Sequence, residues 1–326
     1  MVQSAPTLGP GRPAPGLARP EGAIQGRSHW QLFRTRFRKD RAAVGGLVLV
    51  AMFVAMAIFA PLIAKVVGHG PNQLFQGMLT QLGLPRGPNA HFWFGADQVG
   101  RDVFVRAVYG ARTSLTVSGI GTAAATGIGV AVGTVAGYYG GWLDTLLSRA
   151  IDVFLSLPLL LFAIGLSTVC AASATGCAAG LLQPGLPLVT GIIALFTWPY
   201  IARIVRGQVI SLKQREFVQA ARAMGASDAR IMLSELLPNL VAPIVVYATL
   251  TLPANILFEA ALSYLGVGVP QSTPSWGRML SDATNGNLFT YAWWMMVLPG
   301  LFLLLTTLAF NLVGDGLRDA LDPRGR

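Results

Sequence analysis

The chain has 326 residues, of which 53% are hydrophobic and 12% are charged, and its formal net charge is +10. Soluble domains are usually about 25% charged, so the composition excludes an ordinary soluble enzyme and indicates an integral membrane protein. The basic N-terminal region has few interleaved aromatic residues (Trp30, Phe33 and Phe37). The positive charge therefore points to orientation in the membrane rather than to nucleic-acid binding.

The N-terminal segment divides into two parts. Residues 1–28 are rich in Pro and Gly, which predicts a disordered cytoplasmic tail. They do not form a signal peptide, because no apolar core follows a short basic start. Residues 29–41 alternate bulky apolar and basic side chains. This pattern fits an interfacial basic helix on the membrane surface, or an ordinary basic flank of the first span.

Membrane spans are indicated by runs that lack Asp, Glu, Lys and Arg, at residues 42–64, 113–143, 153–202, 236–258 and 283–314. A spanning helix needs about 20 apolar residues. The run 153–202 is long enough for two spans, and residues 171–187, rich in Gly, Ala, Ser and Pro, interrupt it. We therefore predict an all-α integral membrane protein with six transmembrane helices, at about 42–64, 114–137, 147–170, 187–206, 240–262 and 292–314.

The orientation follows from the Lys and Arg residues, which favour the cytoplasmic side. With these spans, 18 of the 24 basic residues fall in the N-terminal tail, the connections after the second and fourth spans, and the C-terminal tail. We predict a multi-pass membrane protein with both termini cytoplasmic.

The first outward segment, residues 65–112, carries two acid-then-base pairs at i,i+4 spacing, Asp97 with Arg101 and Asp102 with Arg106. This order is favourable on a helix, so we expect a surface helix near the outer interface.

The second span is crowded with small residues, and Gly129, Gly133 and Gly137 are four apart. They fall on one face and let another helix approach closely. Near the start of the third span, Arg149 and Asp152 are expected to pair; the alternative is a proton-relay role for Asp152.

Two cysteines, Cys170 and Cys177, lie in the outer connection between the third and fourth spans. An oxidising compartment permits a disulfide there, and two inert small residues are the alternative. Glu259, at the outer end of the fifth span, either pairs with Arg278, is solvated, or faces a translocation path. The loop after it contains Trp276 and Arg278, and its Gly and Pro content predicts a folded outward loop.

Several kinds of chemistry have no signature here. The three histidines are scattered without metal spacing, no lysine follows Gly to form a phosphate loop, and there is no Gly-x-Ser-x-Gly elbow. We predict no catalytic, metal or cofactor site on this chain. The charge-poor interior also argues against ion-coupled transport, so any energy for transport comes from a partner.

The cytoplasmic connection 207–239 is polar and helix-prone. Residues 215–223 favour a helix, Gly225 suits a left-handed ending, and Ser227 caps a second helix over 228–236 with Asp228 in its first turn. Pro238 then opens the next span. Ala220, Ala221, Ala223 and Ala226 leave a smooth surface that can enter a partner's groove.

This segment, EFVQAARAMGAS at 216–227 followed by Leu-Pro-Asn at 237–239, resembles the EAA loop of ABC importer permeases. The chain resembles the dipeptide/oligopeptide/nickel permease family, C-type subunit, over about residues 30–324. Further matching segments are FGAD at 94–97, YGAR at 109–112, AGYYGG at 136–141, PSWG at 274–277 and FNLVGDGLRDALDP at 310–323. One departure is Glu235, where family members often carry a histidine.

The resemblance implies a type I importer permease fold over residues 42–324, a homologous second permease, two ATPase domains that bind ATP and Mg²⁺, and an extracytoplasmic solute-binding protein. The ATPase-coupling residues would be Glu216, Ala220, Ala221, Met224, Gly225, Ala226 and Ser227. The outer loops would meet the binding protein, and the outer or translocation candidates are Asp97, Arg101, Asp102, Glu259, Trp276 and Arg278.

The function implied is that of a permease for di- or oligopeptides, which lies in the bacterial plasma membrane and forms half of the translocation path. Nickel, glutathione or haem-type ligands are alternatives within the family, and the substrate itself is not readable. An autonomous channel or ion-driven carrier, and a non-transporting membrane scaffold, are rivals from other classes.

Overall fold

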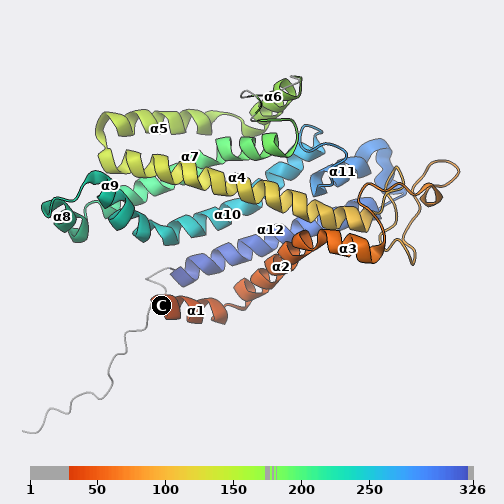
Figure 1. The fold of residues 1–326 in the computed structure, drawn as a ribbon, viewed down its shortest axis with the longest axis horizontal. Coiled ribbons are helices and arrows are strands. Elements are labelled where there is room, and N and C mark those ends of the chain that lie inside the picture. The colour runs from red at the N-terminus through yellow and green to blue at the C-terminus, as the bar shows by residue number, and fades with distance from the viewer. Residues whose placement is uncertain (1–28, 173–176, 178–179, 181, 322–326) are drawn as a thin grey trace, which may run out of the picture.

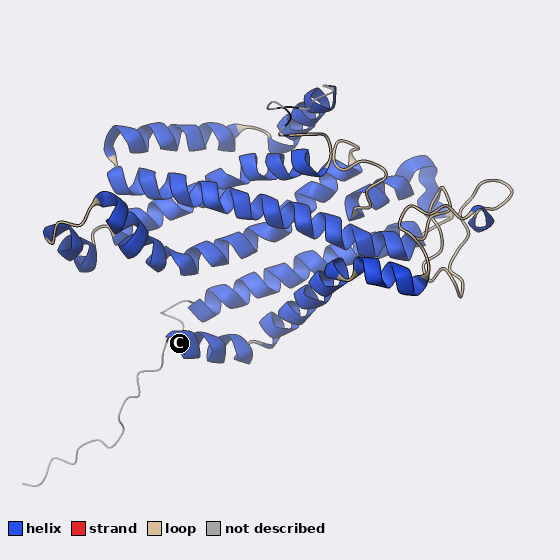
Figure 2. Ribbon diagram, viewed as in Figure 1, coloured by secondary structure: helices blue, strands red, loops and turns tan. Residues whose placement is uncertain are grey.

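The structure, a computed structural model, describes residues 29–172, 177, 180 and 182–321. The predicted tail of residues 1–28 lies outside this part of the chain. Figure 1 shows long helices that run side by side, with α8 and α9 at one end and α3 and α11 at the other. Figure 2 shows helices and loops, and the described residues form no strand beyond three isolated bridges. The all-α prediction is confirmed.

The helices follow the chain in this order. They are α1 (His29–Lys39), α2 (Arg41–Ile58), α3 (Ala60–Val67), η1 (Gln76–Met78), α4 (Val103–Tyr139), α5 (Gly141–Ser156), α6 (Leu159–Ala172), α7 (Leu186–Leu212), α8 (Glu216–Ala223), α9 (Asp228–Arg230), the π-helical η3 (Ile231–Leu236), α10 (Leu237–Tyr264), α11 (Trp276–Thr284), η4 (Asn285–Thr290) and α12 (Trp294–Leu321).

Within the described residues, five helical segments are long and apolar enough to cross a membrane: α2, α4, α7, α9 through α10, and α12. The bent pair α5–α6 makes a sixth span if it is counted as one. Six spans agree with the prediction, but several boundaries and one shape differ from it.

The third span is not the continuous helix predicted at 147–170. Its two halves, α5 and α6, meet at an angle of 85°. Pro158 stands at the break, and Leu157 before it has extended backbone angles (φ −72°, ψ 133°). Proline has no N–H to donate and pushes the preceding residue out of the helical region, so the chain turns here.

The other spans also begin or end elsewhere than predicted, and the causes are clearest in the first and the second. The first span stops at Ile58, and the chain restarts as α3 with Pro61 in its first turn. The second span begins eleven residues earlier than predicted, at Val103, because Asp102 caps the helix by accepting hydrogen bonds from the backbone N–H groups of Phe104 and Val105. A side-chain carboxylate at this position satisfies N–H groups that have no helical partner.

The centre of the bundle is the contact between α4 and α7, and the glycine stripe explains it. A Cβ on Gly133 would lie 2.5 Å from the Ala202 carbonyl oxygen, and one on Gly129 would lie 2.6 Å from Ile201 Cβ. Gly137 similarly meets Val209. The predicted small-residue face is thus confirmed as the surface on which α7 packs. α10 contacts both helices, and α12 packs between α10 and α2.

Candidate functional site

The α8 segment ends in a tight turn that the sequence predicted. Gly225 has φ +81°. Its N–H donates to the Arg222 carbonyl, and the Ala226 N–H donates to the Ala221 carbonyl. This pair of bonds is the Schellman arrangement, which satisfies the last carbonyls of a helix and requires a left-handed residue. Ser227 then caps α9 by accepting from the Arg230 N–H at 3.4 Å.

The two faces of α8 differ in chemistry. Val218 and Ala221 are buried against a cluster that includes Ile231 and Leu236. Glu216, Ala220, Met224, Gly225 and Ser227 are exposed, and the Met224 side chain is 82% exposed. Most of the predicted coupling residues therefore form one accessible surface around the turn. The expected exposure is wrong for Ala221, which faces the bundle and fixes α8 in place. Ala226 is half-buried.

The end of α4 holds this segment against the bundle. The Tyr138 hydroxyl donates to Asp228 Oδ1 at 2.6 Å, and Arg222 Nη2 donates to the same hydroxyl at 3.4 Å. The Arg222 guanidinium also lies 5.7 Å from the centre of the Tyr138 ring. Lys213 Nζ donates to the Gly137 carbonyl at 2.8 Å, and so caps the α4 C-terminus. One aromatic residue thus connects α8 and α9 to a spanning helix.

An open pocket of about 590 Å³ lies beside this contact. It is lined by Tyr138, Tyr139, Lys213, Gln214, Gln219, Arg222 and Asp228. None of these positions was singled out as a coupling residue in the sequence. Asp228 lies in the first turn of its helix, as expected. Its hydrogen bond with Tyr138 joins positions 90 residues apart, so no local sequence pattern could predict it.

Most of the connection 207–239 is helical. α7 continues to Leu212, and α9, η3 and α10 follow one another without a break. The second helix predicted at 228–236 is therefore the first part of the fifth span. The π-helical stretch precedes Pro238, and the Leu237 N–H donates to the Met232 carbonyl five residues back. Ser227 is consequently joined to the fifth span by continuous helix.

At the opposite end, the predicted surface helix is replaced by a buried turn. Asp97 is 4% exposed and Arg101 is 6% exposed. The Asp97 carboxylate accepts from the N–H groups of Val99 and Arg101 and from Arg101 Nε at 2.6 Å. The expected Asp97–Arg101 pair exists, but it stabilises a turn in the protein interior.

Asp102 and Arg106 do not form the side-chain pair that their spacing suggested. Besides capping α4, Asp102 contacts His69 Nδ1 at 2.6 Å. The His69 ring stacks on Phe92, with 4.4 Å between ring centres. Arg106 instead lies 3.5 Å from Asp97 Oδ2 and donates to the Pro71 carbonyl. The N-cap role fixes the carboxylate over the helix end, so it cannot reach one turn along the helix.

The α11 helix completes this buried cluster. Arg278 Nε lies 3.5 Å from Asp282 Oδ1, and Arg101 Nη2 lies 3.6 Å from Asp282 Oδ2. Burial raises the pKa of the Asp282 carboxyl, although Arg278, Arg106 and Arg101 act against this shift. Trp276 is fully buried and donates from Nε1 to the Ala107 carbonyl at 3.0 Å. These side chains hold together the loops at the α3–α11 end of the molecule, and among them only Arg278 is partly exposed.

Glu259 is fully buried between helices, which contradicts its predicted solvation and its pairing with Arg278. Its two carboxyl oxygens accept hydrogen bonds from Ser114 on α4 and Ser263 on α10, each at 2.7 Å. The side chain joins two helices in the interior and faces no open path. The tight contact at Gly277, where a Cβ would lie 2.1 Å from the Ala260 carbonyl oxygen, closes this region from the α11 side.

Two further expectations concern the third span. Cys170 and Cys177 form a disulfide. Asp152 does not pair with Arg149: its Oδ1 accepts from Arg203 Nη2 on α7 at 2.6 Å, and both side chains are more than half exposed.

Comparisons with known proteins cover nearly the whole chain. The family model described as "Binding-protein-dependent transport system inner membrane component" matches residues 129–326, and the model of the N-terminal transmembrane domain of oligopeptide transport permease C matches residues 28–79. The dipeptide transport system permease protein DppC of Alkalihalophilus pseudofirmus is 39% identical, over 96% of this chain and 95% of that protein. The glutathione transport system permease protein GsiD of Escherichia coli is 38% identical, over 92% of each.

One solved structure supports the fold independently. The chain is similar to a subunit of the inward-facing MetNI methionine ABC transporter, with a TM-score of 0.52 and 20% identity. The match covers 67% of this chain and 97% of that one. At this identity the likeness establishes a type I importer permease fold and does not indicate a substrate.

Proposed function

Because the chain belongs to the family of inner membrane components of binding-protein-dependent transport systems, as a C-type peptide permease, we propose that it forms half of the translocation path of an ATP-driven importer for di- and oligopeptides. A homologous second permease supplies the other half. Two ATPase subunits bind ATP and Mg²⁺, and a solute-binding protein delivers the substrate on the outer side. Both termini and the α8 end are cytoplasmic, as the distribution of basic residues favours.

The observation that carries the coupling role is the exposed surface around Gly225. Met224 projects from the turn, and the small side chains of Ala220 and Ala223 beside it leave room for a groove to close around the segment. When the ATPases close on ATP, they move α8. The move reaches α10 through continuous helix and reaches α4 through Tyr138.

A glutamate at Met224 tests this role. The side chain is almost fully exposed, so Met224→Glu leaves the fold intact while it places a charge in the docking surface. We expect ATP-dependent uptake of a labelled dipeptide into vesicles holding the complete transporter to fall at least tenfold, and the ATPase subunits to co-purify poorly. Gln214→Glu adds the same charge at another exposed position of the segment, outside the turn. This control is expected to keep most of the uptake.

Gly225→Trp is a second probe, because any side chain at φ +81° is strained and indole adds bulk to the docking surface. Unchanged uptake in both Met224→Glu and Gly225→Trp would exclude the coupling role. Transport by the purified chain alone, without ATPase subunits, would support an autonomous channel instead.

Glutathione, itself a tripeptide, is the second candidate substrate, because the similar protein from Escherichia coli is named for its transport. Competition between labelled glutathione and dipeptides for uptake separates the two. Uptake of nickel chelates or haem-type ligands in preference to both would move the chain elsewhere in the same family.

A further inference from the structure

The open pocket between the end of α4 and α8, here called the Tyr138 pocket, is lined mainly by polar side chains. Its volume of about 590 Å³ is within the range of about 300–1,000 Å³ that is usual for sites of small ligands. Lys213 and Arg222 are cations and Asp228 is an anion, so positive charge is in excess in the lining. The other lining residues are two glutamines and two tyrosines, which are neutral hydrogen-bonding groups. The lining therefore suits an anion that also carries hydrogen-bonding groups.

The two cations of the pocket keep donors free for a ligand. The Lys213 ammonium donates to the carbonyls of Gly137 and Tyr138, at 2.8 and 3.4 Å, which leaves one of its three N–H groups. Arg222 uses one of its five donors in the 3.4 Å bond to the Tyr138 hydroxyl. Among the described residues, no carboxylate oxygen lies within 4 Å of either cation. Both side chains can therefore bind an anion without giving up a partner.

The pocket lies at the level of the lipid headgroups on the cytoplasmic side. On α7, Arg203 is the first cation after the uncharged run 153–202, so it marks the cytoplasmic boundary of this span. A Cβ on Gly137 would lie 2.9 Å from the Arg206 carbonyl oxygen and 2.8 Å from Val209 Cβ. These residues follow Arg203 by about 5 and 9 Å of helix. The headgroup layer is about 5–8 Å thick on each side, so the Lys213 ammonium, at the Gly137 carbonyl, lies level with it.

Exposed aromatic side chains stand next to the pocket. Tyr139 belongs to its lining and is 51% exposed, and Trp142, just after the turn at Gly140, is 77% exposed. Tyr and Trp are enriched where a membrane meets water, because each joins an apolar ring to a polar group. Leu146, one turn further along α5, is 57% exposed, and the polar Thr145 beside it is exposed as well. The end of α5 next to the pocket thus offers some apolar contact to a lipid chain.

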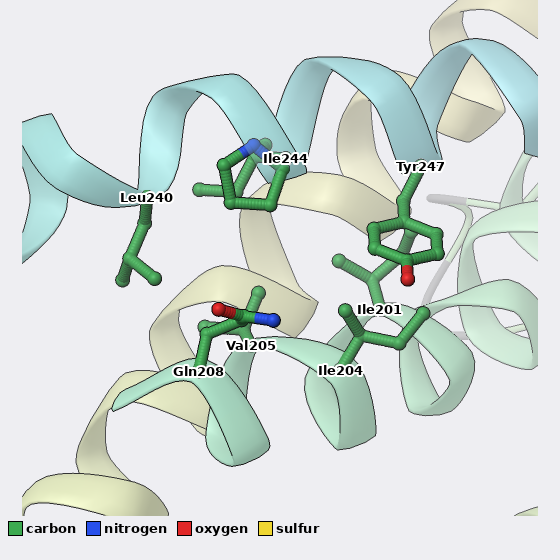
Figure 3. Close-up of a pocket in the computed structure, with 8 residues that line it drawn as sticks. Ile201, Ile204, Val205, Gln208, Leu240, Ile244 and Tyr247 are labelled. Atoms are coloured by element: carbon green, nitrogen blue, oxygen red, sulfur yellow. The ribbon is translucent and has the colours of Figure 1, made fainter. Parts of the chain in front are cut away.

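Three other pockets of the described residues lack this combination. Figure 3 shows the cavity between α7 and α10, where Leu240 and Ile244 face Val205. Its volume is about 10 Å³, as is that of the cavity next to Asp97, and each holds about one water molecule. The pocket of about 410 Å³ beside Arg112 is open, but this arginine and one threonine are its only polar lining residues. Two cations bind a phosphate group more firmly than one does.

We propose that the Tyr138 pocket binds the headgroup of an anionic phospholipid of the cytoplasmic leaflet. The phosphodiester accepts hydrogen bonds from Lys213 and Arg222, and a hydroxyl of a glycerol headgroup donates to Asp228. An acidic side chain of an ATPase subunit also suits the two cations, but the depth of the pocket and its aromatic neighbours favour a lipid. The proposal shares with the proposed function the cytoplasmic position of α8 and adds a lipid as a partner of this segment.

Counting of bound lipids tests the site. The complete transporter is reconstituted with equal amounts of phosphatidylglycerol and phosphatidylcholine of the same chain length, and the lipids that it retains in detergent are counted by native mass spectrometry. Arg222→Gln is expected to lose about one phosphatidylglycerol per copy of this chain and no phosphatidylcholine. Arg222 is exposed, so the change leaves the fold intact. Arg230→Gln removes an exposed cation outside the pocket and is the matched control, which is expected to retain the lipid.

Charge changes of opposite sign in the lining test the electrostatic part of the proposal. Gln214→Glu adds a carboxylate to the pocket and Gln219→Lys adds a cation, and both positions are exposed. We expect the first change to lower the retention of phosphatidylglycerol severalfold and the second to preserve or raise it. Peptide uptake by Gln214→Glu continues, because the lipid is a partner of the segment and not a step of transport. Equal retention by the two variants would contradict the binding of an anion here.

The remaining outcomes identify the occupant. Equal retention of phosphatidylglycerol by the wild type and Arg222→Gln would overturn the proposal. Binding of glycerol phosphate from solution, as tight as that of the lipid, would show a site for soluble anions and would exclude the lipid. Loss of the ATPase subunits from Arg222→Gln, with unchanged lipid, would assign the pocket to an acidic side chain of the ATPase. A transporter that takes up no peptide but loses the lipid on Arg222→Gln would refute the proposed function and keep this site.

Discussion

Asp97 shows how one side chain organises the loops between α3 and α4. Its carboxylate accepts three hydrogen bonds within a five-residue turn and lies between Arg101 and Arg106. All three residues are at most 6% exposed. A buried arginine that loses its carboxylate is left with an uncompensated charge, which is the expensive way to break an ion pair.

Asp97→Ala is therefore expected to lower the free energy of unfolding by about 3–5 kcal/mol, the usual cost of removing one member of a buried pair. Asp97→Asn keeps an oxygen for the two backbone N–H groups and is expected to lose less. Thermal unfolding of the detergent-solubilised transporter measures both. An alanine variant as stable as the wild type would show that solvent reaches the arginines.

Among the helices, the contact between α4 and α7 depends most directly on particular residues. The same helix supplies tight and open glycines: a Cβ on Gly133 would lie 2.5 Å from the Ala202 carbonyl oxygen of α7, whereas a Cβ on Gly127 has nothing within 4 Å. An added methyl group therefore has opposite consequences at two positions six residues apart.

Gly133→Ala is expected to destabilise the protein by about 1–3 kcal/mol, because backbone atoms must move apart. Gly127→Ala removes a flexible residue from an exposed helix position and is expected to stabilise by up to about 1 kcal/mol. The difference between the two unfolding temperatures checks the packing. Equal shifts would mean that α4 and α7 are not held together at Gly133.

The sequence was most informative where a structural rule is local. The capped turn at Gly225 and Ser227 and the glycine face of α4 could both be predicted, because each depends on backbone conformation or side-chain size within a few turns. The break at Pro158 also had a local signal, which the uncharged run around it obscured. The partners of Asp102, Asp152 and Glu259 could not be predicted, since His69, Arg203 and Ser114 lie 33 or more residues away.

For the molecule as a whole, two independent features mark opposite ends. Basic residues gather in the tails and around α8, whereas the disulfide lies in the connection before α7. Gly185, at the start of α7, approaches Pro270 in the loop before α11. Disulfides persist in oxidising compartments, so this end is expected to face outward and the α8 end inward.

Labelling vesicles of known sidedness tests this topology. After mild reduction, the half-buried Cys177 is expected to react with an impermeant thiol reagent in right-side-out vesicles only, whereas Cys170 is fully buried. In vesicles that lack the ATPase subunits, the exposed Ser227, replaced by cysteine in a chain whose Cys170 and Cys177 are serines, is expected to react only when the vesicles are inside-out. The reverse pattern would invert the orientation and with it the side from which substrate enters.

The length of α4 has a mechanical consequence. Its 37 residues make a rod about 55 Å long, which exceeds the bilayer core by about 25 Å. One end is capped by Asp102 among the loops that follow α3, and the other carries the Tyr138 hydroxyl that holds Asp228. A stiff rod cannot tilt at one end alone. Energetic linkage of this kind is reciprocal. Binding of a partner to the loops around Asp102 should therefore change the affinity of the α8 segment for its own partner. Binding at the α8 segment should change the affinity of these loops by the same factor.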